Sequence, residues 1–496
     1  MTHDNYEALL EKLRRVRTLE YVIDALHWDQ ETMMPPRGSA ARAEAVAMLE
    51  ELHHGQCVDP RLGELLDAAG DGGDDPVQTA NIREARRTVD RARKIPASLV
   101  VELARVTTLG HPIWVEARKN ESFAEFVPTL KTIVDLKRQE AECIGFETTP
   151  YDPLLDVYEP AMTTAELSAL FDELRPPLVE LAEKIAASER KLPTLGGPFP
   201  IDDQFKLSRS IARKLGYEFE AGRLDMAVHP FTSGEVPGDI RITTRARPEA
   251  LEECIYSVIH EVGHALYEQG ADPDQMLTPA GRAVSLGVHE SQSRLWENQI
   301  GRSRAFATWL LPQLRDTFST LAVDDADALY LALNSVAPGH IRTEADEITY
   351  NLHIIMRFEI ERALLEKNIE VDDLEEAWNE RAREYLNLTP PNARLGVLQD
   401  IHWVGGHIGY FPTYTLGNIY AAELFAAAQS ELTDLDDAIA VGEFAPLLGW
   451  LRENIHRQGR LHPAKKLVER ATGHAPTATP LIGYLQKKFG DVYSLD

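Results

Sequence analysis

The residues with the clearest chemical potential lie at 260–264, which read HEVGH. His260 and His264 stand four apart, so on a helix both imidazoles project from one face and can converge on a single divalent ion. Glu261 follows the first histidine, where its carboxylate could accept a proton from a water on that ion. This spacing predicts a zinc site with its own general base. The competing interpretation is a helix with two solvated histidines.

The predicted site needs a third protein ligand, because a catalytic zinc usually takes three and leaves a fourth position for water. Glu268 is a further helical turn away, too far from an ion between the two histidines, and Cys254 faces elsewhere. A second helix is predicted from the segment around His289, and Glu290 lies 26 residues after His264, which is enough chain to turn back across the first helix. We therefore predict Glu290 as the third ligand. The alternative for Glu290 is a surface charge at a helix start.

The helix that carries both histidines is predicted over residues 249–269. Its apolar residues recur at spacings of three and four and form one stripe opposite the histidines: Leu251, Ile255, Val258, Ile259, Val262 and Leu266. Gly270 follows at the position of a helix-ending glycine. The helix is therefore expected to pack one face into a core and to present the histidines from the other.

Most of the remaining chain also has helical periodicity. The clearest further segments are residues 164–190, 353–367 and 372–387. Residues 70–76, GDGGDDP, predict an acidic loop, and residues 192–200, LPTLGGPFP, predict a break between helices. We predict a mainly α-helical protein, with residues 1–496 forming a single catalytic domain that could divide into two helical lobes near 192–200.

One stretch, residues 229–248, has a different pattern. Turn-forming residues at 233–238 precede a segment in which Ile240 and Ile242 alternate with polar residues. The alternation predicts a short strand that forms half of a hairpin and ends shortly before the histidine helix. If its edge is exposed, the strand at 239–244 could pair with an extended substrate.

Composition and charge exclude some classes of partner and indicate the cellular compartment. The chain has 496 residues, of which 44% are hydrophobic and 26% charged, as in a globular protein. Its net charge of −28 argues against nucleic acid and anionic membranes as partners, because both attract positive surfaces. No stretch approaches the roughly 20 apolar residues of a membrane span, and the N-terminal segment lacks the pattern of a signal peptide. Cys57, Cys143 and Cys254 form no disulfide framework, so a reducing cytoplasm is expected.

Five further segments, taken with HEVGH, resemble the thermostable carboxypeptidase Taq family of zinc metallocarboxypeptidases. They occur in the family's order: LHWDQETMMPPRGSAAR at 26–42, GDIRITTR at 238–245, HESQSR at 289–294, IRTEAD at 341–346 and GVLQDIHW at 396–403. The resemblance implies a large helical fold with a deep active-site groove and a small β-sheet beside the HExxH helix. It also implies Glu290 as the third metal ligand and zinc as the metal, with cobalt able to substitute. The implied activity is release of single amino acids from peptide C-termini with broad specificity, by a homodimer.

Peptide hydrolysis creates a negative oxygen that needs a hydrogen-bond donor. Tyr410 and Tyr414 lie in the segment HIGYFPTYTLGN at 407–418. We favour Tyr410, which resembles the donor tyrosine of related enzymes, although either ring could instead line the groove. His402 could donate to the same oxygen or hold the substrate backbone.

A carboxypeptidase must also bind a free carboxylate, which a planar guanidinium does with two parallel hydrogen bonds. Arg342, in IRTEAD, is the leading candidate. Arg241, in the predicted strand, is the competitor, but it could instead pair with Asp239 or Asp346. Four polar residues of the motifs are predicted to orient ligands and arginines: Asp239, Asp346, Gln399 and Asp400.

Three functions are compatible with these residues. The first is the zinc carboxypeptidase, and the second is a zinc endo-oligopeptidase on a similar fold, which would not need an arginine for a terminal carboxylate. The third is an acidic helical protein that stores metal, but a store has no use for a base such as Glu261. The segment LHWDQET at 26–32 is expected to be either a lid over the groove or a packing helix.

Overall fold

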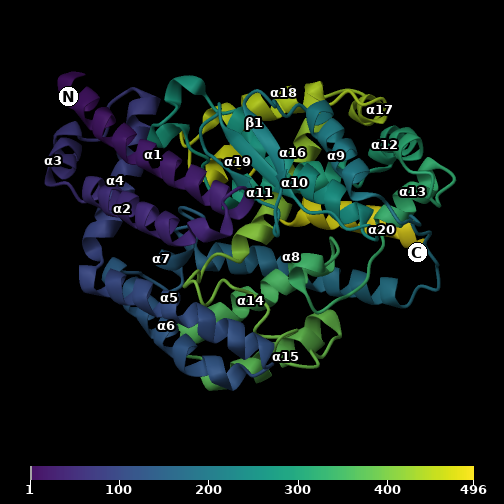
Figure 1. The fold of residues 1–496 in the computed structure, drawn as a ribbon, viewed down its shortest axis with the longest axis horizontal. Helices are drawn as coiled ribbons and strands as arrows, with labels where there is room; N and C mark the ends of the chain where they lie inside the picture. The colour runs from purple at the N-terminus through teal and green to yellow at the C-terminus, as the bar shows by residue number, and fades with distance from the viewer. Residues whose placement is uncertain (1–2, 496) are drawn as a thin grey trace.

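The computed structural model describes residues 3–495, which fold as helices around a small sheet (Figure 1). The first half of the chain contains α1 (His3–Thr32), α2 (Ser39–Cys57), α3 (Pro60–Ala69), α4 (Pro76–Lys94), α5 (Ala97–Lys119), α6 (Phe123–Ile144), α7 (Asp152–Leu155), α8 (Thr164–Ala186) and α9 (Ile201–Leu215). The strands β1 (Gly222–Met226), β2 (Thr232–Ser233) and β3 (Ile240–Thr244) follow. The second half contains α10 (Leu251–Gln269), α11 (Leu286–Arg294), α12 (Arg304–Thr317), α13 (Ala326–Leu333), α14 (Thr349–Leu365), α15 (Leu374–Leu386), α16 (Pro412–Glu431), α17 (Leu435–Ala440), α18 (Ala445–Asn454), α19 (Ala464–Thr472) and α20 (Thr479–Tyr493).

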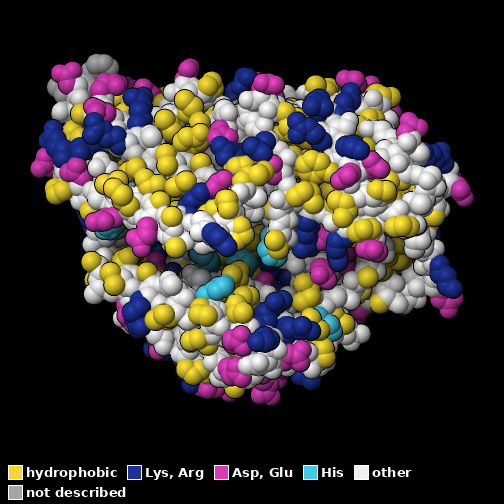
Figure 2. Space-filling view, viewed as in Figure 1, with side chains coloured by type: hydrophobic (Ala, Val, Ile, Leu, Met, Phe, Trp, Pro, Cys, Tyr) yellow, Lys and Arg dark blue, Asp and Glu magenta, His cyan; other side chains and the backbone are white. Residues whose placement is uncertain are grey.

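The elements form two groups in the view of Figure 1. Helices α5, α6, α14 and α15 lie in the lower part, whereas α1 to α4, the sheet, α10 and most of the C-terminal helices lie in the upper part. Figure 2 shows a hollow that crosses this face between the two groups and has histidine side chains in it. The predicted helical fold with a groove and a small sheet is confirmed.

The predicted helices are present, with ends that differ by a few residues. α8 begins after Thr163, whose hydroxyl accepts from the backbone of Glu166 in a reciprocal capping arrangement. α14 begins at Thr349, four residues earlier than predicted, because the Asp346 carboxylate accepts from the backbone N–H groups of Ile348 and Thr349. Gly270 does end α10, but with right-handed backbone angles.

The sheet has the order β1-β3-β2. β2 and β3 pair antiparallel, which confirms the hairpin, and β1 pairs parallel to β3, which the alternation pattern did not indicate. Because β3 is hydrogen-bonded on both sides, its residues have no free edge. The expectation that the strand at 239–244 pairs with substrate is therefore wrong, and the free edges belong to β1 and β2.

One part of the core lies between the sheet and α10. Ile240 and Ile242 are fully buried, and the predicted apolar stripe of α10 joins them in one cluster of buried side chains. Each fully buried aliphatic side chain of this kind contributes roughly 1.5–3 kcal/mol to folding. The same cluster includes Ile185 of α8 and Leu207 of α9. The helices on either side of the loop at 192–200 thus share one core.

The segment LHWDQET forms the end of α1, where Trp28 packs inward and His27 and Glu31 are exposed. Trp28 is buried, with the guanidinium groups of Arg223 and Arg241 over its ring at 4.8 and 4.4 Å from the ring centroid. Cys57, Cys143 and Cys254 are free thiols. Among residues 3–495, no helix has both the length and the apolar character needed to span a bilayer.

Candidate active site

Helices α10 and α11 cross in close contact, and glycines make the contact possible. A side-chain carbon on Gly263 would lie 2.5 Å from Cα of Ser293 on α11, which no structure tolerates. Gly417 of α16 has the same role on the other side of α11, because a carbon there would lie 2.4 Å from Cγ of Glu290. Three helices therefore meet with their backbones close together around the Glu290 side chain.

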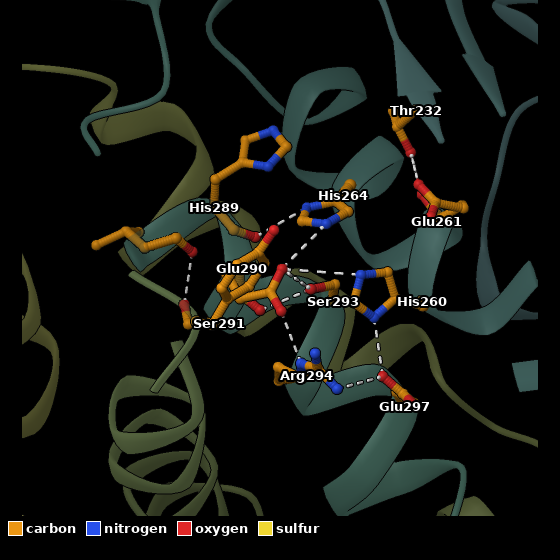
Figure 3. Close-up of polar contacts among 12 residues, drawn as sticks. Thr232, His260, Glu261, His264, His289, Glu290, Ser291, Ser293, Arg294 and Glu297 are labelled. Atoms are coloured by element: carbon orange, nitrogen blue, oxygen red, sulfur yellow. Dashed lines mark hydrogen bonds and ion pairs between the residues drawn. The ribbon is translucent and has the colours of Figure 1, made fainter. Parts of the chain in front are cut away.

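His260, His264 and Glu290 come together at this crossing (Figure 3). One ligand atom from each lies within 4.8 Å of the others. Oε2 of Glu290 is 3.7 Å from Nε2 of His260 and 3.4 Å from Nε2 of His264. These three atoms are the donor set that a catalytic zinc takes, and two imidazoles with one carboxylate leave a fourth position free.

The other ring nitrogens of both histidines have acceptors. Nδ1 of His260 lies 2.8 Å from Oε2 of Glu297, and Nδ1 of His264 lies 3.1 Å from the backbone carbonyl of His289. Because a carbonyl and a carboxylate accept, each Nδ1 carries the proton and each Nε2 has a free lone pair. The two rings are thus oriented and in the tautomer that binds a metal, so the residues fit the ion.

Arg294 holds the two glutamates of the site. Its Nε donates to Oε1 of Glu290 at 2.7 Å, and its Nη1 donates to Oε2 of Glu297 at 3.2 Å. Burial opposes ionisation of Glu290, but Arg294 and His260 outweigh it and hold the pKa of Glu290 well below its usual range. In the same way, Arg294 and His260 lower the pKa of Glu297 to about 2 against the effect of burial. Both carboxylates are therefore ionised at neutral pH.

Glu297 lies on a π-helical turn, Leu295–Ile300, that follows α11. Such widened turns occur frequently at functional sites. Sequence analysis missed Glu297 and Arg294 as members of the site. The signal was the spacing within HESQSRLWEN, since Arg294 lies four residues after Glu290 and Glu297 three residues after Arg294, which places them along one helical face.

Glu261 lies on α10 beside the ligands, with its carboxylate directed towards Thr232 of β2 (Figure 3). The Thr232 hydroxyl lies 2.5 Å from Oε2 of Glu261 and 3.1 Å from its backbone carbonyl. Burial raises the pKa of Glu261, while His260 and the Thr232 hydrogen bond oppose that rise. A raised pKa suits a carboxylate that must accept a proton near neutral pH. No sequence pattern indicated Thr232, because it lies 29 residues before Glu261 and strand β3 comes between them.

Glu159 anchors the start of α11, and it too was absent from the sequence prediction. Its carboxylate is fully buried and accepts from the backbone N–H of Gly287 at 3.0 Å and from the Tyr420 hydroxyl at 3.1 Å. It acts on the first turn of the helix that carries Glu290. Burial raises the pKa of Glu159 to about 7, and hydrogen bonds from Ser285 and Gly287 limit the rise.

A buried carboxyl whose pKa is raised on folding makes stability depend on pH. Below about pH 4.5 the Glu159 carboxyl is neutral in both the folded and the unfolded chain, so it does not reduce stability. As pH rises from there through about 7, the unfolded chain ionises first, and the free energy of unfolding falls. Glu159→Gln, which stays neutral, should therefore gain up to roughly 3 kcal/mol of unfolding free energy relative to the parent chain between about pH 5 and pH 8. Denaturant titrations of both proteins at the two pH values measure the difference. The exposed Glu7→Gln is the control, and an equal response of both variants would contradict the prediction.

Arg342 is buried and held by three contacts. Its Nε donates to Oδ1 of Asp400 at 3.1 Å, its Nη1 donates to the Tyr350 hydroxyl at 3.2 Å, and its backbone N–H donates to the Gln399 side chain at 3.0 Å. Asp400 also accepts from Nε of Arg357 at 2.7 Å. The predicted orienting roles of Gln399 and Asp400 are thus consistent with the geometry, and the described contacts of Arg342 leave its Nη2 for another partner.

Three predicted rings lie close together next to Arg342. The His402 and Tyr410 ring centroids are 5.2 Å apart, the Tyr410 and Tyr414 centroids are 5.4 Å apart, and the Arg342 guanidinium is 4.8 Å from the Tyr414 centroid. Nε2 of His402 lies 3.3 Å from the Tyr414 hydroxyl. Burial and the charge of Glu290 raise the pKa of Tyr410, so its hydroxyl stays protonated and can donate. Burial lowers the pKa of His402 to about 3, which keeps that ring neutral.

Arg241 lies elsewhere, on β3. Its Nε and Nη2 each donate to an oxygen of Asp239 at 2.7 Å, and Asp239 also accepts from the Tyr21 hydroxyl. The alternative partner, Asp346, instead caps α14. The structure therefore brings Arg342, His402 and Tyr410 together and ties Arg241 to Asp239.

A cavity of about 580 Å³ adjoins the metal ligands. Thr232 and His289 form part of its wall, and His289 stacks on His264 with 4.5 Å between ring centroids. Residues of α1 form another part of the wall. The space beside the site is thus large enough for a ligand larger than water.

Comparisons with known proteins agree over almost the whole chain. Residues 8–489 match the family model described as carboxypeptidase Taq (M32) metallopeptidase. The thermostable carboxypeptidase 1 of Thermus thermophilus is 43% identical, covering 98% of this chain and 99% of its own, and the carboxypeptidase 1 of Bacillus subtilis is 35% identical, covering 99% of each. The crystal structure of an M32 carboxypeptidase from Deinococcus radiodurans superimposes with a TM-score of 0.96 at 39% identity, covering 99% of this chain and 100% of that one.

Proposed function

Because the chain belongs to the carboxypeptidase Taq (M32) metallopeptidase family and is a metallocarboxypeptidase, we propose that it releases single amino acids from peptide C-termini with broad specificity. We propose zinc as the ion, with cobalt able to substitute, and His260, His264 and Glu290 as its ligands. The observation that carries this proposal is the pair of free Nε2 atoms converging on Glu290. We further propose a homodimer in which residues 1–496 of each chain form one catalytic domain.

Each residue of the site has a role in the proposed reaction. When bound, the ion would act as a Lewis acid and make water nucleophilic at neutral pH. Glu261 accepts a proton from the attacking water and later delivers it to the leaving amine, while Thr232 positions its carboxylate. Tyr410 donates a hydrogen bond to the oxygen that becomes negative, and His402 holds the substrate backbone from the same side.

Arg342 binds the terminal carboxylate of the substrate in this proposal. It is buried beside Tyr350 and Tyr414, where a carboxylate would lose most of its hydration and need a charged donor. Asp400 accepts from Nε of Arg342 and is itself held by Arg357, so the orientation of Arg342 is set before substrate arrives. Arg241 is the weaker candidate, because Asp239 already uses two of its nitrogens.

Arg342→Ala is expected to lower kcat/KM for free-acid peptides by on the order of 10²-fold, which corresponds to about 3 kcal/mol of lost stabilisation. C-terminally amidated peptides, which lack the charge, should be affected little. Steady-state kinetics on paired free-acid and amidated peptides measures both effects, and metal content should stay intact since Arg342 is no ligand.

Arg241→Ala is the matched control, because it removes the same guanidinium from the nearby sheet. Arg241→Ala should change kcat/KM for neither the free-acid nor the amidated peptides. If Arg342→Ala lowered kcat/KM equally for both peptide series, Arg342 would support the fold and would not bind the terminal carboxylate. If amidated peptides were cleaved at internal bonds as readily as free acids lose their last residue, the chain would be a zinc endo-oligopeptidase, and mass analysis of the products separates the two outcomes.

A further inference from the structure

The cavity beside the metal ligands has no role in the reaction steps above. Its wall combines the end of α1, the edge strand β2 and the segment that leads into α11. It adjoins the reacting groups, because its wall residues Thr232 and His289 touch Glu261 and His264. Neither Arg342 nor Asp400 nor His402 contributes to it. Arg342 therefore lies outside the wall of this cavity.

The cations of the cavity wall all have anionic partners. Arg282 pairs with Glu20 and Glu235, Arg87 pairs with Asp156, and Arg460 lies 3.6 Å from Glu84. The wall therefore offers no unpaired positive charge to a ligand.

The anions of the wall differ from one another. Glu235 is paired with arginines, and Glu268 lies 3.0 Å from Nε2 of His289. Asp24 and the exposed Glu31 line the same cavity, and within residues 3–495 neither side-chain carboxylate makes an ion pair or a hydrogen bond. The charge left unmatched on this wall is negative.

Asp24 is stronger evidence for a ligand than Glu31, because Asp24 is half-buried. Burial raises the pKa of Asp24, and the nearby charge of Glu235 adds to the rise, while Arg17 opposes it. A partly desolvated carboxylate that faces a cavity without a partner is costly unless a ligand supplies the cation. The charge of Asp24 thus complements that of Arg342, since an anion lines the cavity and a cation lies outside it.

We propose that this cavity receives the part of the peptide on the amino-terminal side of the cleaved bond, and that Asp24 accepts a hydrogen bond from a cationic nitrogen of that peptide. The proposal rests on the proposed function, in which Arg342 holds the carboxyl end, so that the remaining peptide extends past Glu261 and along the free edge of β2. The nitrogen is either the free α-amine of a short peptide or the side chain of a lysine or arginine. Asp24 would then favour short or basic peptides without touching the reacting atoms.

Matched peptides test the proposal. A series of alanine peptides of increasing length is prepared with a free or an acetylated N-terminus, each with a free C-terminus. At the length where the amine reaches Asp24, the parent enzyme should cleave the free-amine form with a kcat/KM on the order of 10-fold higher than the acetylated form. In Asp24→Asn, which keeps the shape, this ratio should fall to near one. Acetylated peptides with a lysine moved along the chain show whether a side-chain amine serves as well as the α-amine.

Glu7→Gln is the matched control, because it removes one negative charge from the exposed face of the same helix without touching the cavity. It should keep the parent ratio, which excludes an effect of net charge alone. Binding of the same peptides to Glu261→Gln, with and without Asp24→Asn, gives the preference as a ratio of Kd values that does not depend on turnover.

Two results would overturn the proposal. One is a parent enzyme that shows no preference for a cationic nitrogen at any length, and the other is an Asp24→Asn variant that keeps the parent preference or loses both peptide forms equally. Failure of the proposed function looks different, because no single C-terminal residue would then be released from either peptide form by the parent enzyme.

Discussion

Glu261→Gln is expected to retain the metal and to lose peptide hydrolysis by a factor of roughly 10² to 10⁴ in kcat. The amide has the shape of the carboxylate, and its oxygen can still accept from Thr232, but it cannot take a proton from water. The carboxylate is buried and has its pKa raised by that burial, so bulk solvent offers no comparable base at this position. Single-turnover kinetics, together with zinc analysis of the purified variant, measures the effect.

Thr232→Val is the matched control for positioning. Valine keeps the branched shape and removes the hydroxyl that lies 2.5 Å from Glu261, so the base remains but is less well oriented. Its loss in kcat should be far smaller than that of Glu261→Gln. A Glu261→Gln variant that hydrolysed peptides at close to the parent rate would exclude Glu261 as the base.

The second large effect is expected from the metal ligands. His264→Ala and Glu290→Gln should each weaken zinc binding by more than the 10- to 100-fold that is typical for loss of an outer partner, and activity should fall with occupancy. Glu290→Gln is preferred to alanine because Arg294 is nearly buried and keeps an oxygen acceptor in the amide. Competition with a chromogenic chelator gives the affinities.

Two further variants change residues that contact the predicted ligands, and their zinc affinity is compared with that of the ligand variants. Glu297→Gln leaves all three ligands in place but weakens the acceptor of the His260 Nδ1 proton, so we expect a loss of about 10- to 100-fold in zinc affinity. His289→Asn removes a ring that stacks on His264 but keeps the backbone carbonyl that accepts from it, so zinc should remain bound. Full zinc occupancy in both His264→Ala and Glu290→Gln would exclude the assigned ligand set.

Local spacing explains why so much could be predicted. The i, i+4 relation of His260 and His264 and the apolar stripe opposite them depend only on helical geometry, so the orientation of α10 followed from sequence. The order of six motifs along the chain identified the family and the fold class, and both are confirmed. Glu290 was reached by spacing and resemblance, and the structure brings it to both histidines.

Contacts between segments that are distant in sequence could not be predicted from local spacing. The sequence by itself determined the family, the helical fold and which residues could bind a metal, because these depend on short-range patterns. Only the tertiary structure decided that Thr232 meets Glu261, that Glu159 anchors α11, and that β3 is a central strand with Arg241 tied to Asp239. The physical reason is that a hydrogen bond needs its donor and acceptor within about 3 Å, and chain separation alone does not determine which pairs come that close.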